Sequence, residues 1–435
     1  MSIADSTPPR AAGLDSAPSD TLAVPARSGR FSGRTFDAWS NRDFRYIYFA
    51  NVAQFGSMQM KQLAQGVLVY QFTGSFAALG LVSLAHAIPG LVLSPVGGVV
   101  ADRVPKRSVM QWGQMFNMLN AAVLGVLAAL GILGFEHIIV SAVLQGTVNA
   151  IMMPSRQSII PDLVGREKTM NAVALNTSGE NVMQLVGPAL GGFLLAVWAP
   201  SGVFGLMAGF FAIAVYCTSR VPKYPPHAAP ARAAHRGGNL GDLREGFAYT
   251  IAEPTIRTLI GVNFLVILAS MPYTALLPGF VHDVLHRGAA EQGFLMSVTG
   301  IGAVAGSLFV ATLPNRNRGQ MLMLAATVLS ASLVAFAISE SYYITLPIML
   351  VVGVASSVRR SLGQVLIQTY PDPEYRGRVM AIWMMQFSLM SLGTFGAGIL
   401  SDLIGPQLAI GGMAAGLMVV VVLVMLFVPR MRQLQ

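Results

Sequence analysis

The chain has 435 residues, of which 54% are hydrophobic and only 11% are charged. A water-soluble domain carries about 25% charged residues, so this composition excludes a soluble globular protein and indicates a chain solvated mainly by lipid. The net charge of +9 does not indicate nucleic-acid binding, because the basic residues lie beside apolar segments, where they set membrane topology. The single cysteine, Cys217, excludes an intramolecular disulfide, and the scattered histidines predict neither a metal site nor a cofactor.

Residues 1–42 are expected to form a disordered cytoplasmic tail. They are rich in Ala, Pro, Ser and Arg, and they contain no apolar run long enough for the core of a signal peptide. We therefore expect the first hydrophobic helix to remain in the membrane as an uncleaved anchor.

Twelve apolar segments follow, each close to the length of about 20 residues that a membrane-spanning helix needs. Six fall in residues 43–219 and are predicted at 46–70, 77–101, 108–133, 138–160, 171–197 and 201–219. Six fall in residues 257–429 and are predicted at 257–281, 290–313, 321–339, 342–368, 379–402 and 406–428. The sequence thus predicts an all-α membrane protein built from two six-helix halves.

A polar segment, residues 220–256, separates the two predicted halves. It is rich in Pro, Ala and Arg, which indicates a cytoplasmic linker. Within it, residues 240–252 are expected to form a short amphipathic helix on the membrane surface. Residues 430–435 are expected to form a second cytoplasmic tail.

Lys and Arg residues predict the orientation, because they are retained on the cytoplasmic side of a membrane. With the N-terminus inside, 23 of the 28 Lys and Arg residues fall in cytoplasmic segments. Arg287 alone falls outside, and the remaining four lie within predicted spans: Lys61, Arg156, Arg359 and Arg360. Both termini are therefore expected in the cytoplasm.

A short pattern recurs at corresponding positions of the two halves, just after the fourth span of each. The matching residues are Pro161, Asp162, Arg166 and Met170 in the first half, and Pro371, Asp372, Arg376 and Met380 in the second. Duplicated six-helix halves are a known framework for alternating access, with the substrate site near the midplane between them.

The loop between the second and third spans carries a motif. From Gly98 it reads Gly-Val-Val-Ala-Asp-Arg-Val-Pro-Lys-Arg, which resembles the G-x-x-x-D-R-x-x-[KR]-[KR] signature of the major facilitator superfamily. A generic cytoplasmic loop would explain the cations but not the pairing of Gly98 with Asp102. Gly98 is expected to permit close helix contact, and Asp102 to face the positive N-terminus of a neighbouring helix. The resemblance implies gating roles for Gly98, Asp102, Arg103 and Arg107.

Further segments are similar to the bacterial transmembrane secretion effector group, the enterobactin exporter branch of the superfamily. They are residues 68–75, 154–164, 170–176 and 376–380. The resemblance covers residues 42 to 428 and implies the twelve-helix fold of a transporter in the bacterial inner membrane.

The fifth span contains Gly-Pro-Ala-Leu-Gly-Gly at residues 187–192, which resembles the core of the antiporter motif of superfamily exporters. Pro188 bends the helix, and Gly187 and Gly191 allow tight packing, so the segment is expected to act as a pivot. Met183 stands where the longer motif has another glycine. A packing kink without directional meaning therefore stays open.

Glu180 is the expected proton-coupling residue. It lies near the middle of the fifth span, where an ionisable group usually faces a cavity or a partner. Burial favours the neutral form of a carboxyl group and makes protonation reversible near neutral pH. The alternative is a carboxylate neutralised permanently by Lys61 or an arginine.

Polar residues in other spans are candidate substrate ligands. Lys61 and Arg359 are expected to attract an anionic or polar substrate, although Arg359 and its neighbour Arg360 point about 100° apart, so only one is expected to face inward. Weaker candidates are amides and a histidine, namely Gln59, Gln62, His86 and Asn181.

The sequence therefore predicts a secondary transporter, acting as a monomer with protons and a small-molecule substrate as partners. We expect it to export a small amphipathic molecule such as a drug, siderophore or secondary metabolite by proton antiport. An importer or facilitator of a small polar solute is the alternative. No G-x-x-x-x-G-K-[ST] sequence is present for ATP binding, and no clustered nucleophile and base predict an enzyme.

Overall fold

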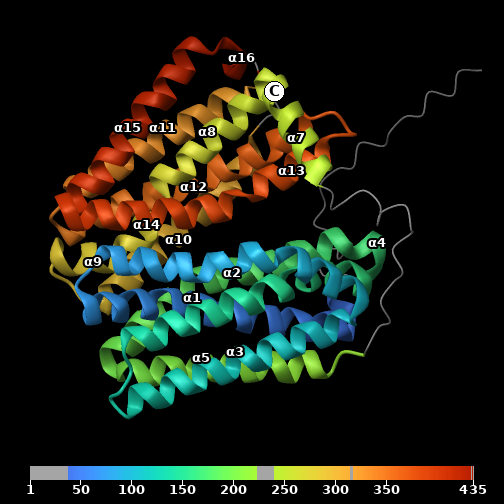
Figure 1. The fold of residues 1–435 in the computed structure, drawn as a ribbon, viewed down its shortest axis with the longest axis vertical. Coiled ribbons are helices and arrows are strands. Elements are labelled where there is room, and N and C mark those ends of the chain that lie inside the picture. The colour runs from blue at the N-terminus through green and yellow to red at the C-terminus, as the bar shows by residue number, and fades with distance from the viewer. Residues whose placement is uncertain (1–37, 223–239, 314–316, 433, 435) are drawn as a thin grey trace, which may run out of the picture.

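The computed structural model describes residues 38–222, 240–313, 317–432 and 434, which form helices and short connections without a β-strand (Figure 1). Most of the expected N-terminal tail, residues 1–37, lies outside the described residues. The central part of the expected linker, residues 223–239, also lies outside them. The all-α prediction is confirmed over the described part of the chain.

Five helices form an N-terminal bundle, the name used here for residues 38–222. Helix α1 packs against α4 and α5, α2 packs against α4, and α3 packs against α4 and α5. In Figure 1 this bundle is coloured blue to green. Its helices are α1 (Arg42–Thr73), α2 (Phe76–Arg103), α3 (Lys106–Ala129), α4 (Phe135–Val197) and α5 (Ala199–Ser219).

The remaining helices form a C-terminal bundle, residues 240–434, coloured yellow to red in Figure 1. Helix α12 packs against α10 and α11, while α15 packs against α8, α11 and α14. These helices are α7 (Leu240–Ala252), α8 (Pro254–Ser270), α9 (Tyr273–Asp283), α10 (Ala289–Thr312), α11 (Arg318–Ile338), α12 (Tyr342–Thr369), α13 (Arg376–Met384), α14 (Gln386–Ile404), α15 (Pro406–Phe427) and α16 (Pro429–Arg432).

Ten segments of the described chain are long and apolar enough to cross a membrane. Helix α4 supplies two, the pairs α8–α9 and α13–α14 supply one each, and the others lie in α2, α5, α10, α11, α12 and α15. These ten correspond to ten of the twelve predicted spans. Helices α1 and α3 are long enough to cross a membrane but less apolar than these ten segments. Polar side chains, such as Lys61 and Asn117, interrupt their apolar runs.

The fourth and fifth predicted spans belong to one long segment, α4, which turns at Gly165. The φ angle of Gly165 is 72° and its ψ angle is 168°, a backbone conformation that glycine adopts without a steric penalty. The two predicted spans at 138–160 and 171–197 are thus both helical, and the helix extends beyond them, to Val164 before the turn and from Arg166 after it.

Two other predicted spans are each interrupted. Residues 257–281 are divided between α8 and α9 near Pro272, which has no backbone N–H to continue the helical hydrogen bonds. Residues 379–402 are divided between α13 and α14 at Met385. Each interruption leaves one apolar segment of membrane-spanning length.

Residues 38–42, the last part of the expected tail, pack against the rest of the protein. Ala38 is fully buried, and the Asn41 side chain accepts hydrogen bonds from the backbone N–H groups of Asp43 and Phe44 at the start of α1. Asn41 also donates to the carbonyl oxygen of Leu163 at 2.8 Å. Residues 38–42 are therefore part of the fold, which corrects the predicted boundary.

The short helix expected at residues 240–252 is α7, and it packs on α13 of the C-terminal bundle. Glu245 pairs with Arg378 at 2.9 Å, and the Tyr249 hydroxyl donates to Asp372 at 3.1 Å. The rings of Tyr249 and Tyr375 stack with centroids 4.2 Å apart. Burial raises the pKa of the Tyr249 phenol, so it stays protonated as a donor at neutral pH.

The two bundles meet where glycines bring helix backbones together. A Cβ atom added to Gly192 of α4 would lie 2.3 Å from the carbonyl oxygen of Ala289 in α10. One added to Gly80 of α2 would lie 2.5 Å from the Cα atom of Phe395 in α14. Small residues let membrane helices approach closely, so α4–α10 and α2–α14 form the main contacts between the bundles.

Candidate functional site: a polar cavity between the bundles

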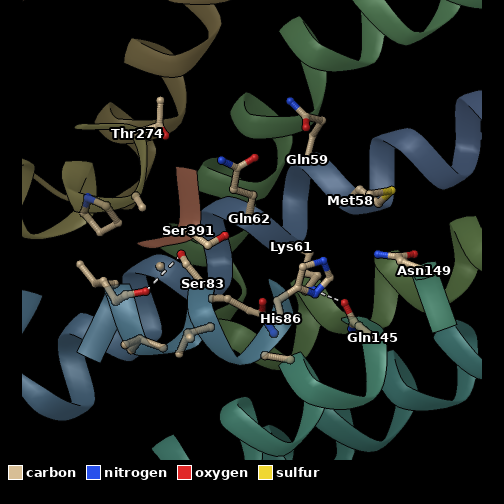
Figure 2. Close-up of a pocket in the computed structure, with 18 of the residues that line it drawn as sticks. Met58, Gln59, Lys61, Gln62, Ser83, His86, Gln145, Asn149, Thr274 and Ser391 are labelled. Carbon is tan, nitrogen blue, oxygen red and sulfur yellow. Dashed lines mark hydrogen bonds between the residues drawn. The ribbon is translucent and has the colours of Figure 1, made fainter. Parts of the chain in front are cut away.

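A cavity of about 300 Å³ lies between the N-terminal bundle and helices α9 and α14 of the C-terminal bundle. Figure 2 shows its polar side chains converging from both bundles. Its polar and charged lining residues are Gln59, Lys61, Gln62, Gln65, Ser83, His86, Asn117, Gln145, Asn149, Thr274 and Ser391.

A second cavity of about 170 Å³ shares Gln59, Gln62 and Thr274 with the first. Its other walls come from α4 of the N-terminal bundle and from α10 and α12 of the C-terminal bundle, including Gln184 and Arg360. The two cavities therefore have a common wall on α1, and each is enclosed by both bundles.

The spacing of polar residues along α1 explains this common wall. Lys61, Gln62 and Gln65 follow the apolar Met58 by three, four and seven residues, which places all four on one face of a helix. They line the first cavity, and Gln59 and Gln62 also reach the second. The polar residues that lower the hydropathy of α1 are thus the residues that form the cavity.

Lys61 is the cation of the first cavity. Its ammonium group donates a hydrogen bond to the Gln145 side-chain oxygen, and Figure 2 shows both beside His86. The Nδ1 atom of His86 is buried and finds no hydrogen-bond partner among the described residues. Lys61 likewise has no carboxylate partner within the described part of the chain.

The structure distinguishes between the two adjacent arginines of α12. Arg359 is buried at 5% exposure and donates to the Asn263 side-chain oxygen at 3.0 Å inside the C-terminal bundle. Arg360 lines the second cavity. Arg359, the expected substrate ligand, therefore lines neither of these two cavities, whereas Arg360 lines the second.

Glu180 lies outside the linings of both cavities. Its carboxylate forms an ion pair with Arg156 and accepts a hydrogen bond from Asn176 at 3.1 Å. Asn51 of α1 donates to Asn176 at 2.9 Å, so the pair is connected to α1. Asn181, predicted as a substrate ligand, also lies outside both linings.

Several cavity residues were missed by the sequence analysis. Gln145 and Asn149 lie four residues apart in α4, and this spacing on an apolar segment was a usable signal. Ser83, Asn117 and Ser391 are isolated polar residues on apolar helices, and nothing in the sequence distinguishes them from residues that bond neighbouring helices.

A model of the family described as transmembrane secretion effector matches residues 34–435, which include all the helices described here. The chain belongs to the transmembrane secretion effector family. This confirms the resemblance on which the superfamily and its transporter fold were predicted.

Curated relatives of this chain include transporters of siderophores and drugs. The staphyloferrin A transporter of Staphylococcus aureus is 26% identical, over 75% of this chain and 81% of its own length. The multidrug efflux pump Tap of Mycolicibacterium fortuitum is 25% identical, over 84% of this chain and 91% of its own. The enterobactin exporter EntS of Shigella boydii is 25% identical, over 90% and 92%.

Solved transporter structures share the fold of this chain at low sequence identity. The nucleoside transporter NupG has a TM-score of 0.67 at 15% identity, covering 88% of this chain and 98% of its own. A bacterial homologue of the human lysosomal transporter Spinster, in an inward-facing conformation, has a TM-score of 0.63 at 15% identity, covering 93% and 97%. The family and these neighbours identify a membrane transporter rather than an enzyme.

The loop that carries the superfamily motif joins helices within the N-terminal bundle. Arg107 donates to the carbonyl oxygens of Thr218 at 3.1 Å and Ser219 at 2.7 Å, at the end of α5. Lys106 pairs with Asp162 at 2.6 Å, and Arg103 is exposed. The side chain of Asp102 lies outside the described part, so its predicted role stays a prediction.

The expected role of Gly98 in close helix contact is corrected by the structure. A Cβ atom added to Gly98 would meet nothing within 4 Å, whereas one added to Gly97 would lie 2.1 Å from the carbonyl oxygen of Ala150. The close contact between α2 and α4 is therefore made at Gly97, one residue earlier.

The Gly-Pro-x-x-Gly-Gly segment packs on both bundles. A Cβ atom added to Gly187 would lie 2.7 Å from Gln59 Cβ, and one added to Gly191 would lie 3.2 Å from Met60 Cα, both in α1. On the adjoining face, the Pro188 carbonyl oxygen would lie 2.5 Å from a Cβ atom added to Gly293 of α10. The segment therefore lies at the α4–α10 crossing between the two bundles.

The bundles are also joined where α1 ends and α2 begins. Tyr70 donates a hydrogen bond to Asp283. Asp402 of α14 accepts from the Ser75 hydroxyl at 2.6 Å and from the backbone N–H groups of Phe76 at 2.7 Å and Ala77 at 3.0 Å. This carboxylate caps the N-terminus of α2, a favourable position for an anion.

Proposed function

We propose that this chain is a secondary exporter that moves a small amphipathic molecule out of a bacterial cytoplasm by alternating access. The observation that carries the proposal is the polar cavity enclosed by both bundles. A drug, a siderophore or another secondary metabolite fits the cargo of the named relatives, which include the staphyloferrin A transporter, an enterobactin exporter and a multidrug pump.

Twelve spans in two six-helix halves are part of this proposal. Helices α1 and α3 have 32 and 24 residues, and at 1.5 Å per residue either exceeds the roughly 30 Å of bilayer core. Their polar residues Lys61, Gln62 and Asn117 face the cavity, so lipid need not solvate them. The chain would act as a monomer in the inner membrane, with both termini in the cytoplasm.

In this orientation, the end of the molecule at which Tyr70, Asp283 and Asp402 join the two bundles would face outward. The cavity would be accessible from the cytoplasm. An exporter loads its cargo in this state. The loop from Gly98 to Arg107 and the crossing at Gly187, Pro188 and Gly191 would then gate the change to the outward-facing state.

Glu180 is proposed as the proton site. Its protonation would break the ion pair with Arg156, which is how a carboxylate can couple a proton to a helix movement. The phenol of Tyr48 in α1 lies beside Gly179 on the same turn of α4. The charged partner of Glu180 is thus Arg156 on α4, and Tyr48 of α1 packs beside the preceding residue.

The proposal is tested by comparing cells with and without the protein. Metabolite profiling should find at least one amphipathic compound retained inside cells that lack it, and enterobactin and staphyloferrin A are suitable first probes. Restoring the gene should restore release to the medium. Identical internal pools across profiled metabolites and drugs would contradict export, and a pool that falls without the protein would indicate the importer.

A further inference from the structure

The charges of the two cavities are all of one sign. Lys61 and Arg360 line them, together with the titratable His86, and no Asp or Glu among the described residues lines either cavity. Arg360 makes no hydrogen bond or ion pair with any described residue. Lys61 bonds to an uncharged amide, Gln145.

The other two cationic side chains within the predicted spans have partners inside the protein. Arg156 pairs with a carboxylate, Glu180, and Arg359 is held by Asn263 inside its own bundle. An ion surrounded by low-dielectric helices is costly unless a counter-ion or an aqueous cavity compensates for its charge. Lys61 and Arg360 are the cations for which the described protein supplies a cavity and no anion.

The wall between these cations carries uncharged hydrogen-bonding groups. Gln59, Gln62 and Thr274 line both cavities, and amide and hydroxyl groups donate readily to oxygen atoms. Lys61 belongs to the N-terminal bundle and Arg360 to the C-terminal bundle. A ligand that contacts both cations therefore contacts both moving parts of the transporter.

We propose that the cavity takes an elongated substrate with two separated anionic, oxygen-bearing groups, one bound by Lys61 and the other by Arg360. The inference rests on the proposed transport function and specifies its substrate class. Dianionic cargo is favoured over lipophilic cations because a cation would meet only like charge. A dianion also reduces the repulsion between the two protein cations, which eases the approach of the bundles.

The test measures equilibrium binding to the full chain in lipid nanodiscs without an ion gradient. The probes are the straight-chain dicarboxylates from succinate to sebacate, the monocarboxylates of matching length, and tetraphenylphosphonium. We expect at least one dicarboxylate to bind with an optimum in chain length. The matching monocarboxylate should bind about tenfold more weakly, which corresponds to losing one charged contact of about 1.4 kcal/mol.

Variants identify the two contacts. Lys61→Gln and Arg360→Gln should each weaken the preferred dicarboxylate about tenfold, whereas Lys61→Arg and Arg360→Lys should retain most of the affinity. Arg45→Gln, at an exposed position near the start of α1, is the matched control and should bind as the parent does. Monodisperse elution of each variant checks that it has folded.

The inference is overturned if no dicarboxylate binds, if tetraphenylphosphonium binds more tightly than every dicarboxylate, or if both Gln variants bind unchanged. Its failure is distinguishable from failure of the proposed function. A chain that binds dianions at equilibrium but exports nothing contradicts export alone, and a chain that exports only cations contradicts this substrate class alone.

Discussion

Ionisable side chains inside the apolar helices fall into three groups with different surroundings. Glu180 and Arg156 pair with each other, Arg359 bonds to Asn263, and Lys61 and Arg360 line the cavities. The first group suits a switch, because a single proton removes its attraction. The second fixes neighbouring helices, and the third is available to a ligand.

A Glu180→Gln variant tests the switch. It should remove accumulation driven by a pH gradient, because the amide cannot take up a proton, while exchange of substrate without a gradient continues. Vesicle flux measured with and without the gradient separates these activities. Glu136→Gln is the control, since Glu136 is 75% exposed at the start of α4. Undiminished gradient-driven accumulation would remove Glu180 from the coupling mechanism.

Residue type and position in a span identified Lys61, Gln59, Gln62 and His86 as cavity candidates, and the structure places all four there. The sequence left open which of Arg359 and Arg360 faces inward and named Arg359 as the candidate ligand, whereas Arg360 lines the cavity. Adjacent residues diverge by about 100° around a helix, so the packing of α12 decides which faces the cavity. That packing involves helices distant in sequence, such as α8 with Asn263.

Helix crossings at glycine form the contacts between the bundles. The sequence indicated the glycine motif of α4. It did not indicate that one face of this segment packs on α1 and the other on α10. Nor did it predict the turn at Gly165 within a continuous α4, because hydropathy marks an apolar run and not the direction of its axis. Pro272 offered a clearer signal for the interruption between α8 and α9.

A Gly192→Val variant tests the α4–α10 crossing. Its Cβ atom alone would lie 2.3 Å from the Ala289 carbonyl oxygen, so the two helices must separate, at a cost of about 1–3 kcal/mol. We expect a melting temperature several degrees lower and reduced transport. Gly205→Val is the control, because a Cβ atom there meets nothing within 4 Å. Equal melting temperatures for the two variants would contradict the proposed tight crossing.

At the scale of the whole molecule, one end is closed by contacts between the bundles and the cavity lies behind it. Composition, span count and the distribution of Lys and Arg predicted a helical membrane protein, and a family model over residues 34–435 agrees. The sequence did not predict which end of the molecule is closed. Asp402 and the N-terminus of α2 come together only when the two bundles are assembled.

An Asp402→Ala variant tests this closure. Loss of the carboxylate leaves the N–H groups of Phe76 and Ala77 without their acceptor, so the closed end should open more often. Ser391→Cys, placed in the cavity lining in a Cys217→Ser background, reports opening through labelling by an impermeant maleimide from the outer side. We expect labelling to rise severalfold with Asp402→Ala and to stay unchanged with Glu136→Ala. Unchanged labelling with Asp402→Ala would contradict the assigned closure.

The central claim is export driven by a proton gradient, and inverted membrane vesicles test it most directly. Their outer surface is the cytoplasmic face, so an exporter should concentrate in the vesicle interior the compound that cells lacking the protein retain. The account predicts accumulation above the external concentration when the interior is acidic, and its loss on addition of a protonophore. Accumulation in right-side-out vesicles alone, or accumulation unaffected by collapse of the gradient, would contradict it.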